Sequence, residues 1–369
     1  MEYKRCTKTI MDTSDPNISF NNKGESNYFT NFKKITLQNW DPNGNLNAFE
    51  NLIEKIKKDG FKKKYNCAIG ISGGLDSSYL VYIAWKYKLR PLLIHTDSGW
   101  NSERAVQNIK LLLDTTGFDL ITHVVDWSEM KDLQRSFFKA SVPNQDIPQD
   151  QAIYAALYKT VTDQRIKWVL NGSNFATESI LPTAWAYNAG DIYHIKKIHS
   201  LFGENKLKNY PMMGYSNFAI RMIFSKYFKI AKPLNLLKYE IKSSKKILED
   251  NFGWEDHGYK HYESRFTKFY QGWYLPKVFG YDKRLAHLSS LILSNQMTRD
   301  EALKDLENSS LSEEEIFEEK RFVSKKLGFT DNEFEDILNL PKKDHLDYPN
   351  RASMLANLIK IRDLLKLKK

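Results

Sequence analysis

Ile69-Gly70-Ile71-Ser72-Gly73-Gly74-Leu75-Asp76-Ser77-Ser78 is the stretch that decides the fold. It begins in a short apolar run that predicts a buried strand and continues into a segment of helical character. Two adjacent glycines let the backbone turn tightly and bring its N–H groups together. The serine hydroxyls add donors, and a helix that begins near Asp76 directs its positive end to the same place. The stretch therefore predicts a turn that binds a pyrophosphate.

Asp76 stands inside this turn, where its carboxylate would repel a phosphate. A magnesium ion between the two removes the repulsion, because Mg²⁺ is commonly held by a carboxylate together with phosphate oxygens. The spacing of glycines and serines in this turn matches neither of two other phosphate-binding loops, G-x-x-x-x-G-K-[ST] and G-x-G-x-x-G. We expect four residues to hold the pyrophosphate, namely Ser72, Gly73, Gly74 and Ser77.

Apolar runs and helical patterns alternate along the first half of the chain. We expect strands at 65–71, 91–95, 120–125 and 168–170, and helices at about 76–88, 101–116 and 149–165. The 101–116 helix is expected to bury one side, made of Val106, Ile109, Leu113 and Thr116. This alternation is typical of an α/β fold with a doubly wound parallel sheet.

Ligands of such sheets bind beyond the carboxyl ends of the strands. Three of the expected ends are polar, small and glycine-containing, at 72–74, 96–99 and 171–174. They predict one shared site. A histidine at a strand end is equally typical of a buried, hydrogen-bonded side chain, and for His95 both alternatives stay open.

The whole chain limits the choice of function. Its 369 residues fit one large domain or two, and 41% apolar residues are enough for a core. Two cysteines, Cys6 and Cys67, cannot form a disulfide framework. With no apolar signal sequence and no run long enough to span a membrane, we expect a cytoplasmic protein. The net charge of +10 is compatible with an anionic substrate, with nucleic acid or with a lysine-rich surface.

The chain is expected to have three parts. Residues 1–45 predict an irregular lead-in, 46–250 the α/β domain with a helical insertion, and 251–369 a helical region that contributes to the substrate site. Aromatic residues between 183 and 235 predict packing of the insertion rather than a substrate wall. Three capping boxes predict three short helices in the tail, at Thr298/Glu301, Ser312/Glu315 and Thr330/Glu333, followed by a last helix that ends at Lys369.

The turn from Ser72 to Ser77 resembles that of the PP-loop ATP pyrophosphatase superfamily, whose fold is adenine nucleotide alpha hydrolase-like. Other segments narrow the resemblance, among them Asn171-Gly172-Ser173-Asn174, Gly258-Tyr259-Lys260-His261-Tyr262-Glu263-Ser264-Arg265, Leu275-Pro276-Lys277 and Gly280-Tyr281-Asp282-Lys283-Arg284. Together they resemble the N-acetyl sugar amidotransferases of bacterial surface-polysaccharide synthesis, the WbpG/PseA-like group. This resemblance runs from about residue 5 to 300.

The resemblance implies a reaction that converts an acetamido group of a sugar into an acetamidino group. ATP would adenylate the amide oxygen with release of pyrophosphate, and ammonia would then displace AMP. The protein would supply positioning and charge stabilisation rather than a covalent nucleophile. ATP and Mg²⁺ are the implied cofactors. Because the chain has no glutaminase signature, the implied partners are a glutaminase subunit and a barrel subunit resembling imidazole-glycerol-phosphate synthase.

We assign roles within this reaction. Asp76 would help hold Mg²⁺, and Glu178 would act as a base or bind ammonium. Lys260 and Arg265 would neutralise the leaving pyrophosphate, because in-line transfer at phosphorus needs cations there. Five further residues would lie around the nucleotide or the metal, namely His95, Thr96, Asp97, Gly172 and Asn174. Two alternatives stay open: Glu178 as a helix cap, and the charged residues near Lys260 as a solvated surface.

Two other functions stay open. A PP-loop enzyme that thiolates tRNA or forms lysidine is favoured by the net charge of +10. Thiolation is disfavoured, because Cys6 and Cys67 lie too far apart in sequence to form a sulfur-carrying pair. An inactive scaffold for partner subunits is disfavoured by the intact turn at Ser72–Ser77.

The N-terminal segment resembles the family's zinc ribbon without most of its ligands. Only Cys6 remains of two Cys-x-x-Cys pairs, and Thr9, Ser26 and Phe29 stand at the other positions. One thiolate cannot hold a tetrahedral structural zinc, so we predict no metal here. Crystals of the protein should show no anomalous scattering peak at the zinc edge beside Cys6, and such a peak would disprove the prediction.

Overall fold

Five parallel strands form the sheet at the centre of the molecule. The computed structural model describes residues 2–214, 228–354 and 357. The strands are β1 (Cys67–Gly70), β2 (Pro91–Asp97), β3 (Asp119–Val124), β4 (Trp168–Leu170) and β5 (Lys229–Ala231). Their order is β3-β2-β1-β4-β5. The chain builds one side of the sheet through β2 and β3 and then crosses to the other side, so the topological switch point lies between β1 and β4.

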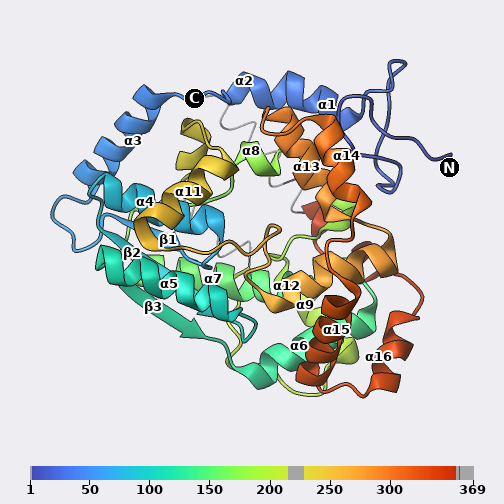
Figure 1. The fold of residues 1–369 in the computed structure, drawn as a ribbon. Coiled ribbons are helices and arrows are strands. Elements are labelled where there is room, and N and C mark those ends of the chain that lie inside the picture. The colour runs from blue at the N-terminus through green and yellow to red at the C-terminus, as the bar shows by residue number, and fades with distance from the viewer. Residues whose placement is uncertain (1, 215–227, 355–356, 358–369) are drawn as a thin grey trace.

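Helices cover both faces of this sheet (Figure 1). Cys67 and Ile69 of β1 pack into a core with four helices: α3 (Leu46–Asp59), α4 (Leu75–Lys86), α5 (Glu103–Thr116) and α11 (Ile241–Phe252). Ala68 lies on the opposite face and packs with α7 (Ile147–Asp163). Successive side chains of a strand point to opposite faces, so both faces need cover. The predicted doubly wound α/β fold is confirmed.

Two elements of the α/β part lie outside the sequence prediction. The helix α6 (Trp127–Ala140) follows β3, and β5 forms an edge of the sheet with only three residues. The helix predicted at 101–116 is α5, but its buried side is different. Ala105 and Asn108 are buried whereas Val106 is 53% exposed. The reason is that α5 packs its small and polar residues on the glycine turn after β1.

The C-terminal region is helical, as predicted. Its elements are α12 (Arg265–Phe269), the π-helical η4 (Tyr270–Phe279), α13 (Lys283–Leu293), α14 (Arg299–Glu307), α15 (Glu313–Leu327) and α16 (Asp331–Leu338). All three predicted capping boxes are present, at the N-termini of α14, α15 and α16. Trp100 and Phe138 of the α/β part share one core with Phe266 and Phe334. One hydrophobic core therefore contains residues from both sides of the predicted domain boundary near residue 250.

Short elements complete the described chain. They are α1 (Asn27–Asn31), η1 (Phe32–Thr36), α2 (Leu37–Asn39), α8 (Phe175–Glu178), η2 (Thr183–Trp185), α9 (Ile192–Phe202), η3 (Pro233–Leu236) and η5 (His345–Asp347). Of the aromatic residues predicted to pack the insertion, Trp185 and Tyr210 are buried. Three others, Tyr215, Phe224 and Tyr227, lie outside the described residues, as does the end of the predicted last helix.

The N-terminal segment brings together three of the four positions that resemble zinc-ribbon ligands. Cys6, Thr9 and Ser26 are all buried. The Cys6 Sγ accepts the backbone N–H of Lys8 at 3.4 Å and that of Ser26 at 3.2 Å. Arg299 of α14 donates to the carbonyl oxygens of Cys6 and Thr9. Hydrogen bonds thus connect the residues that a metal would otherwise join.

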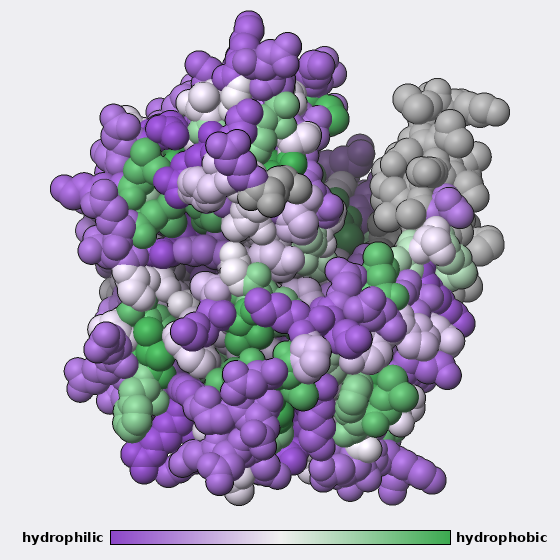
Figure 2. Space-filling model, turned by 90° about the vertical axis from the view of Figure 1, so that its right-hand side faces the viewer, coloured by the Kyte–Doolittle hydropathy of each residue, from purple (hydrophilic) through white to green (hydrophobic). Residues whose placement is uncertain are grey.

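The surface is mainly hydrophilic on the face shown in Figure 2, where hydrophobic residues form separate patches. Two large hydrophobic side chains, Phe61 and Phe317, are 78% and 65% exposed. Single exposed side chains of this kind are normal for a globular protein. Across the described ranges, we find no helix long and apolar enough to cross a membrane.

Phe138 connects the α/β part to the C-terminal helices. Its buried ring lies 6.0 Å from that of Phe266, 5.1 Å from Tyr274 and 5.7 Å from Phe334, measured between centroids. We expect Phe138→Ala to lower the free energy of unfolding by about 3–5 kcal/mol, measured by denaturant titration. The exposed Phe317→Ala serves as the control and should change it by less than about 0.5 kcal/mol. Similar losses in both variants would contradict the shared core.

Candidate functional site

A cavity of about 730 Å³ lies at the carboxyl ends of β1 and β4. Its wall comes from the turn after β1, the end of β2, the segment after β4, the first turn of α7 and the segment 257–264. A parallel sheet with this strand order binds ligands at this switch point. Nine of the predicted site residues line it, namely Ser72, Gly74, Asp76, Ser77, His95, Thr96, Gly172, Glu178 and Lys260.

The turn after β1 is fixed by hydrogen bonds to one carbonyl group. Gly73 has a φ of +82°, which favours glycine. Its carbonyl oxygen accepts from Trp254 Nε1 and His257 Nε2 at 3.1 Å each, and from Asn108 Nδ2 at 3.3 Å. The helix α4 begins directly after Gly74, which has no side chain to cap it. The N-terminus of α4 therefore meets the cavity without a capping group, an arrangement that suits an anion.

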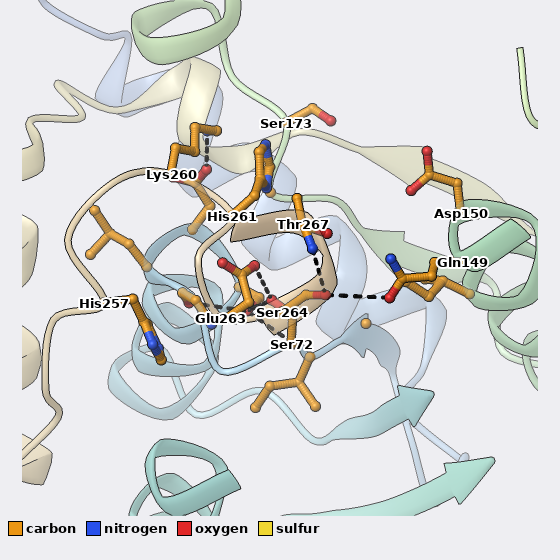
Figure 3. Close-up of a pocket in the computed structure, with 18 of the residues that line it drawn as sticks. Ser72, Gln149, Asp150, Ser173, His257, Lys260, His261, Glu263, Ser264 and Thr267 are labelled. Carbon is orange, nitrogen blue, oxygen red and sulfur yellow. Dashed lines mark hydrogen bonds and ion pairs between the residues drawn. The ribbon is translucent and has the colours of Figure 1, made fainter. Parts of the chain in front are cut away.

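Glu263 is a site residue that the sequence analysis did not single out. Its Oε1 accepts a hydrogen bond of 3.0 Å from Ser72 Oγ (Figure 3). A Cβ added to Gly74 would lie only 2.6 Å from the same oxygen. Burial raises the pKa of this carboxyl group. Because Glu263 abuts the anion-binding turn, a pyrophosphate needs a cation between itself and this group. The segment 258–267 is polar and aromatic throughout, and its pattern does not reveal which residue faces the turn.

Lys260 lies between two of the predicted site carboxylates. Its Nζ is 2.6 Å from Asp76 Oδ2 and 2.9 Å from Glu178 Oε1, and it donates to Thr177 Oγ1 at 2.8 Å. Burial by itself lowers the pKa of Lys260, but the charges of Asp76 and Glu178 outweigh it and raise the pKa. The second oxygen of Asp76, Oδ1, accepts a 2.5 Å hydrogen bond from the Tyr239 hydroxyl. The ammonium group is therefore held charged beside the turn.

These contacts decide how a magnesium ion fits. Each carboxylate oxygen of Asp76 already accepts from one donor and keeps a second lone pair with which it could bind an ion. In the chain as described, no group of three or more Asp, Glu, His or Cys side chains is arranged to hold a metal. Mg²⁺ normally takes one or two carboxylates and completes its shell with phosphate oxygens and water. An ion that arrives with phosphates would need few protein ligands, and Asp76 and Glu263 are the carboxylates beside the turn that could hold it.

His95 is a fixed part of the cavity wall. Its Nδ1–H donates to the carbonyl oxygen of Ile71 at 2.8 Å. Since that carbonyl can only accept, Nε2 is the acceptor of the 3.0 Å bond from Asn101 Nδ2. The sequence left two alternatives open for His95, a buried hydrogen-bonded side chain or a site residue. The ring is buried and hydrogen-bonded, and it also lines the cavity.

Four predicted residues are not on the cavity wall, namely Gly73, Asp97, Asn174 and Arg265. Asp97 Oδ1 accepts the N–H of the residue two positions later and shapes the turn after β2. Asn174 caps α8. Arg265 is 3.0 Å from Glu319 and lies 3.5 Å above the ring of Phe322. Its expected contact with a leaving pyrophosphate is thus corrected, because α12 begins at Arg265 and directs this side chain to α15.

The far end of the cavity is lined by polar residues that were not predicted. Asp146, at the start of α7, accepts hydrogen bonds from Gln149 Nε2 and Thr267 Oγ1 at 3.0 Å each and from Gln271 Nε2 at 3.3 Å. Gln149 Oε1 in turn accepts from Ser264 Oγ at 3.3 Å (Figure 3). The cavity therefore joins the glycine turn to a second polar region.

Comparison with known proteins gives one family match. Residues 263–362 match the model described as LPS biosynthesis protein WbpG-like, C-terminal domain. The match begins at Glu263 and includes the helices α12 to α16. No curated protein matches the chain.

Among 85 matching chains of solved structures, three illustrate the range. NMN synthetase from Francisella tularensis is 13% identical, with a TM-score of 0.31, and the match covers 83% of this chain and 99% of that one. The NH3-dependent NAD synthetase from Campylobacter jejuni is also 13% identical, with a TM-score of 0.28 and coverage of 56% and 93%. A predicted tRNA methyltransferase subunit from Methanocaldococcus jannaschii is 15% identical, with a TM-score of 0.27 and coverage of 50% and 73%. At these TM-scores, nothing about this chain's reaction follows from them.

The turn after β1 is expected to tolerate no side chain at Gly73. An added Cβ would lie 2.5 Å from the carbonyl oxygen of Ala105 in α5. Gly117 is the matched control, because its φ is +65° but nothing lies within 4 Å of an added Cβ. We expect Gly117→Ala to cost about 1 kcal/mol of stability and Gly73→Ala at least about 2 kcal/mol more, measured by thermal unfolding. Equal losses would contradict the close packing of the turn on α5.

Proposed function

We propose that the chain is an ATP-dependent amidotransferase. The premise is that residues 263–362 are similar to the C-terminal domain of WbpG-like proteins. It converts an acetamido group of a sugar into an acetamidino group, in bacterial surface-polysaccharide synthesis. The observation that carries the proposal is the position of Lys260 between Asp76 and Glu178, beside an uncapped helix N-terminus. This arrangement combines an anion site with the ammonium group of Lys260, which can stabilise negative charge as it develops.

The turn after β1 receives the pyrophosphate part of ATP. The glycines at 73 and 74 allow the close approach, and Ser72 and Ser77 contribute hydroxyl groups. Asp76 and Glu263 would hold Mg²⁺, which supplies charge neutralisation between these carboxylates and the phosphates. The strand-end residues His95 and Thr96 form the wall next to the nucleotide. Gly172 leaves room beside Asp76, because an added Cβ would lie 3.2 Å from the Asp76 side chain.

Lys260 stabilises charge on the leaving group. Asp76 and Glu178 both form ion pairs with Lys260, and these two charges hold it in place. With Asp76 engaged by a bound ion, Glu178 would keep Lys260 oriented and leave its Nζ available to a phosphate oxygen. The substrate's amide oxygen then forms a bond to the α-phosphorus as the bond to pyrophosphate breaks. Lys260 contributes most where negative charge grows on the departing group.

Ammonia completes the reaction by displacing AMP. Its nitrogen forms a bond to the imidate carbon, the C–O bond to AMP breaks, and the electron pair leaves with AMP. A glutaminase subunit, together with a barrel subunit resembling imidazole-glycerol-phosphate synthase, is the proposed ammonia source. In its absence, ammonium salts should support the reaction.

The proposal predicts three products from one incubation. The chain is mixed with ATP, Mg²⁺, ammonium and diacetamido sugars, both free and nucleotide-linked. We expect AMP and pyrophosphate in equal amounts and a sugar product about one mass unit lighter, because NH replaces O. Lys260→Met should lower the rate by about 100-fold or more, as expected for loss of one charge-stabilising donor.

Lys268→Met is the matched control for this experiment. Lys268 also pairs with carboxylates, those of Glu315 and Glu319, but it does not line the cavity. Its variant should keep the wild-type rate. Pyrophosphate release that does not depend on any acetamido sugar would contradict the proposed acceptor, and absence of release would favour an inactive scaffold.

A PP-loop enzyme that modifies tRNA is the second candidate, and the net charge of +10 favours it. Transfer of sulfur is disfavoured because Cys6 and Cys67 are both buried, one in the N-terminal segment and one in β1. Salt-sensitive binding of tRNA in a gel-shift assay, without any sugar product, would support this candidate.

A further inference from the structure

Among the residues that the structure describes, one carboxyl group on the cavity wall has no partner. Six acidic residues line the cavity: Asp76, Asp146, Asp150, Glu178, Asp256 and Glu263. Asp76 and Glu178 pair with Lys260, Asp256 pairs with Lys245, Glu263 accepts from Ser72, and Asp146 has three donors. Asp150 stands apart, because within residues 2–214 and 228–354 its side chain accepts no hydrogen bond and forms no ion pair.

Asp150 projects into the cavity from the first turn of α7. Its carboxyl group points away from the helix toward the side on which Ser173 and His261 lie (Figure 3). The side chain is exposed to the cavity, whereas protein surrounds the residue on its other sides. A ligand in the cavity can therefore reach both oxygens.

The surroundings of Asp150 set its charge. Burial raises the pKa of Asp150 to about 7, with the charge of Asp146 as the second cause, while the ammonium group of Lys283 acts in the opposite direction. Tyr210 and Tyr270 also face it, and burial raises the pKa of both phenols, so they stay neutral. Near neutral pH, Asp150 can thus both accept and release a proton.

The proposed reaction needs such a group at the acceptor end. At neutral pH ammonia is present mainly as ammonium, which is a cation without a nucleophilic electron pair. The acetamide substrate is neutral, but the acetamidine product is a planar cation with parallel N–H groups. Such a cation pairs with a carboxylate through two hydrogen bonds, as the guanidinium group of arginine does. Glu178, which the sequence suggested for ammonium, is committed to Lys260.

We propose that Asp150 receives ammonium, takes one proton from it and pairs with the amidinium group that forms. The inference rests on the proposed function and adds the location of the amination step within the cavity. Ammonium transfers a proton to the Asp150 carboxylate and becomes ammonia. After AMP transfer the amide nitrogen gives its proton to water, which leaves a neutral imidate. Ammonia adds to this imidate, AMP leaves with the electron pair of the C–O bond, and the three hydrogens brought by ammonia remain on the two nitrogens of the cationic product. Asp150 then releases its proton to water.

Asp150→Asn separates the two half-reactions. We expect sugar-dependent pyrophosphate release in the first turnover, measured with the protein in excess over the sugar, to stay within about 3-fold of wild type, because adenylation occurs at the other end of the cavity. Formation of the amidine from ammonium should fall by about 100-fold or more. Hydroxylamine, which is uncharged at pH 7, needs no deprotonation and should still give the amidoxime product in the variant.

Asp163→Asn is the matched control on the same helix. Asp163 pairs with Lys159 at the exposed end of α7, and its variant should behave as wild type in all three assays. An Asp150→Asn protein that forms the amidine at the wild-type rate overturns the inference. So does one that loses pyrophosphate release, amidine and amidoxime to the same extent, because that pattern indicates a general structural role.

A binding measurement separates this inference from the proposed function. Acetamidinium, with neutral acetamide as its control, is titrated into the full chain without ATP or sugar and followed by calorimetry. We expect binding at pH 8 that weakens at pH 6, where Asp150 is protonated, and at least a 10-fold loss in Asp150→Asn. Asp150-dependent binding without sugar-dependent pyrophosphate release would overturn the proposed function alone. Binding that Asp150→Asn leaves unchanged would overturn the inference.

Discussion

The ion pairs of Lys260 hold the cavity together. Asp76 belongs to the first turn of α4, Glu178 ends α8, and Lys260 comes from the segment before α12, so one ammonium group joins three separate parts of the chain. Such a buried group is costly to leave unpaired, at about 3–5 kcal/mol when one partner is removed. The geometry of the switch point therefore depends on a charge balance, and a ligand that displaces Lys260 from its oxygen of Asp76 or Glu178 also changes the position of Lys260.

The cavity as a whole carries more acidic than basic groups. Its six carboxyl groups face three lysines, Lys245, Lys260 and Lys283. His261 does not correct this imbalance, because burial first and then the charge of Lys260 lower its pKa to about 3. Burial likewise lowers the pKa of His257. A polyphosphate is therefore compatible with this cavity only together with cations, although the molecule as a whole is basic.

The sequence predicts the parts of the site that depend on local backbone geometry. The glycine turn after β1, the strand ends and the capping boxes all follow from residues close together in the chain. The partners of Lys260 do not, because Asp76 and Glu178 are 184 and 82 positions away. The segment 258–264 has neither helical nor strand periodicity, so its sequence could not show that Glu263 faces the turn while Arg265 faces α15. Asp150 was missed because a charged residue in the first turn of a helix is usually solvated.

The N-terminal segment and α13 are joined by a contact of very long range. The backbone N–H of Ile10 donates to Ser289 Oγ, 279 residues later in the chain, and the surrounding apolar residues form one core. During synthesis Ile10 must wait for this partner. At about 5–20 residues per second the delay is roughly 15–55 seconds. Throughout that interval Ile10 and Met11 lack the α13 side chains of their core, so the nascent chain presents apolar residues on which a chaperone can act.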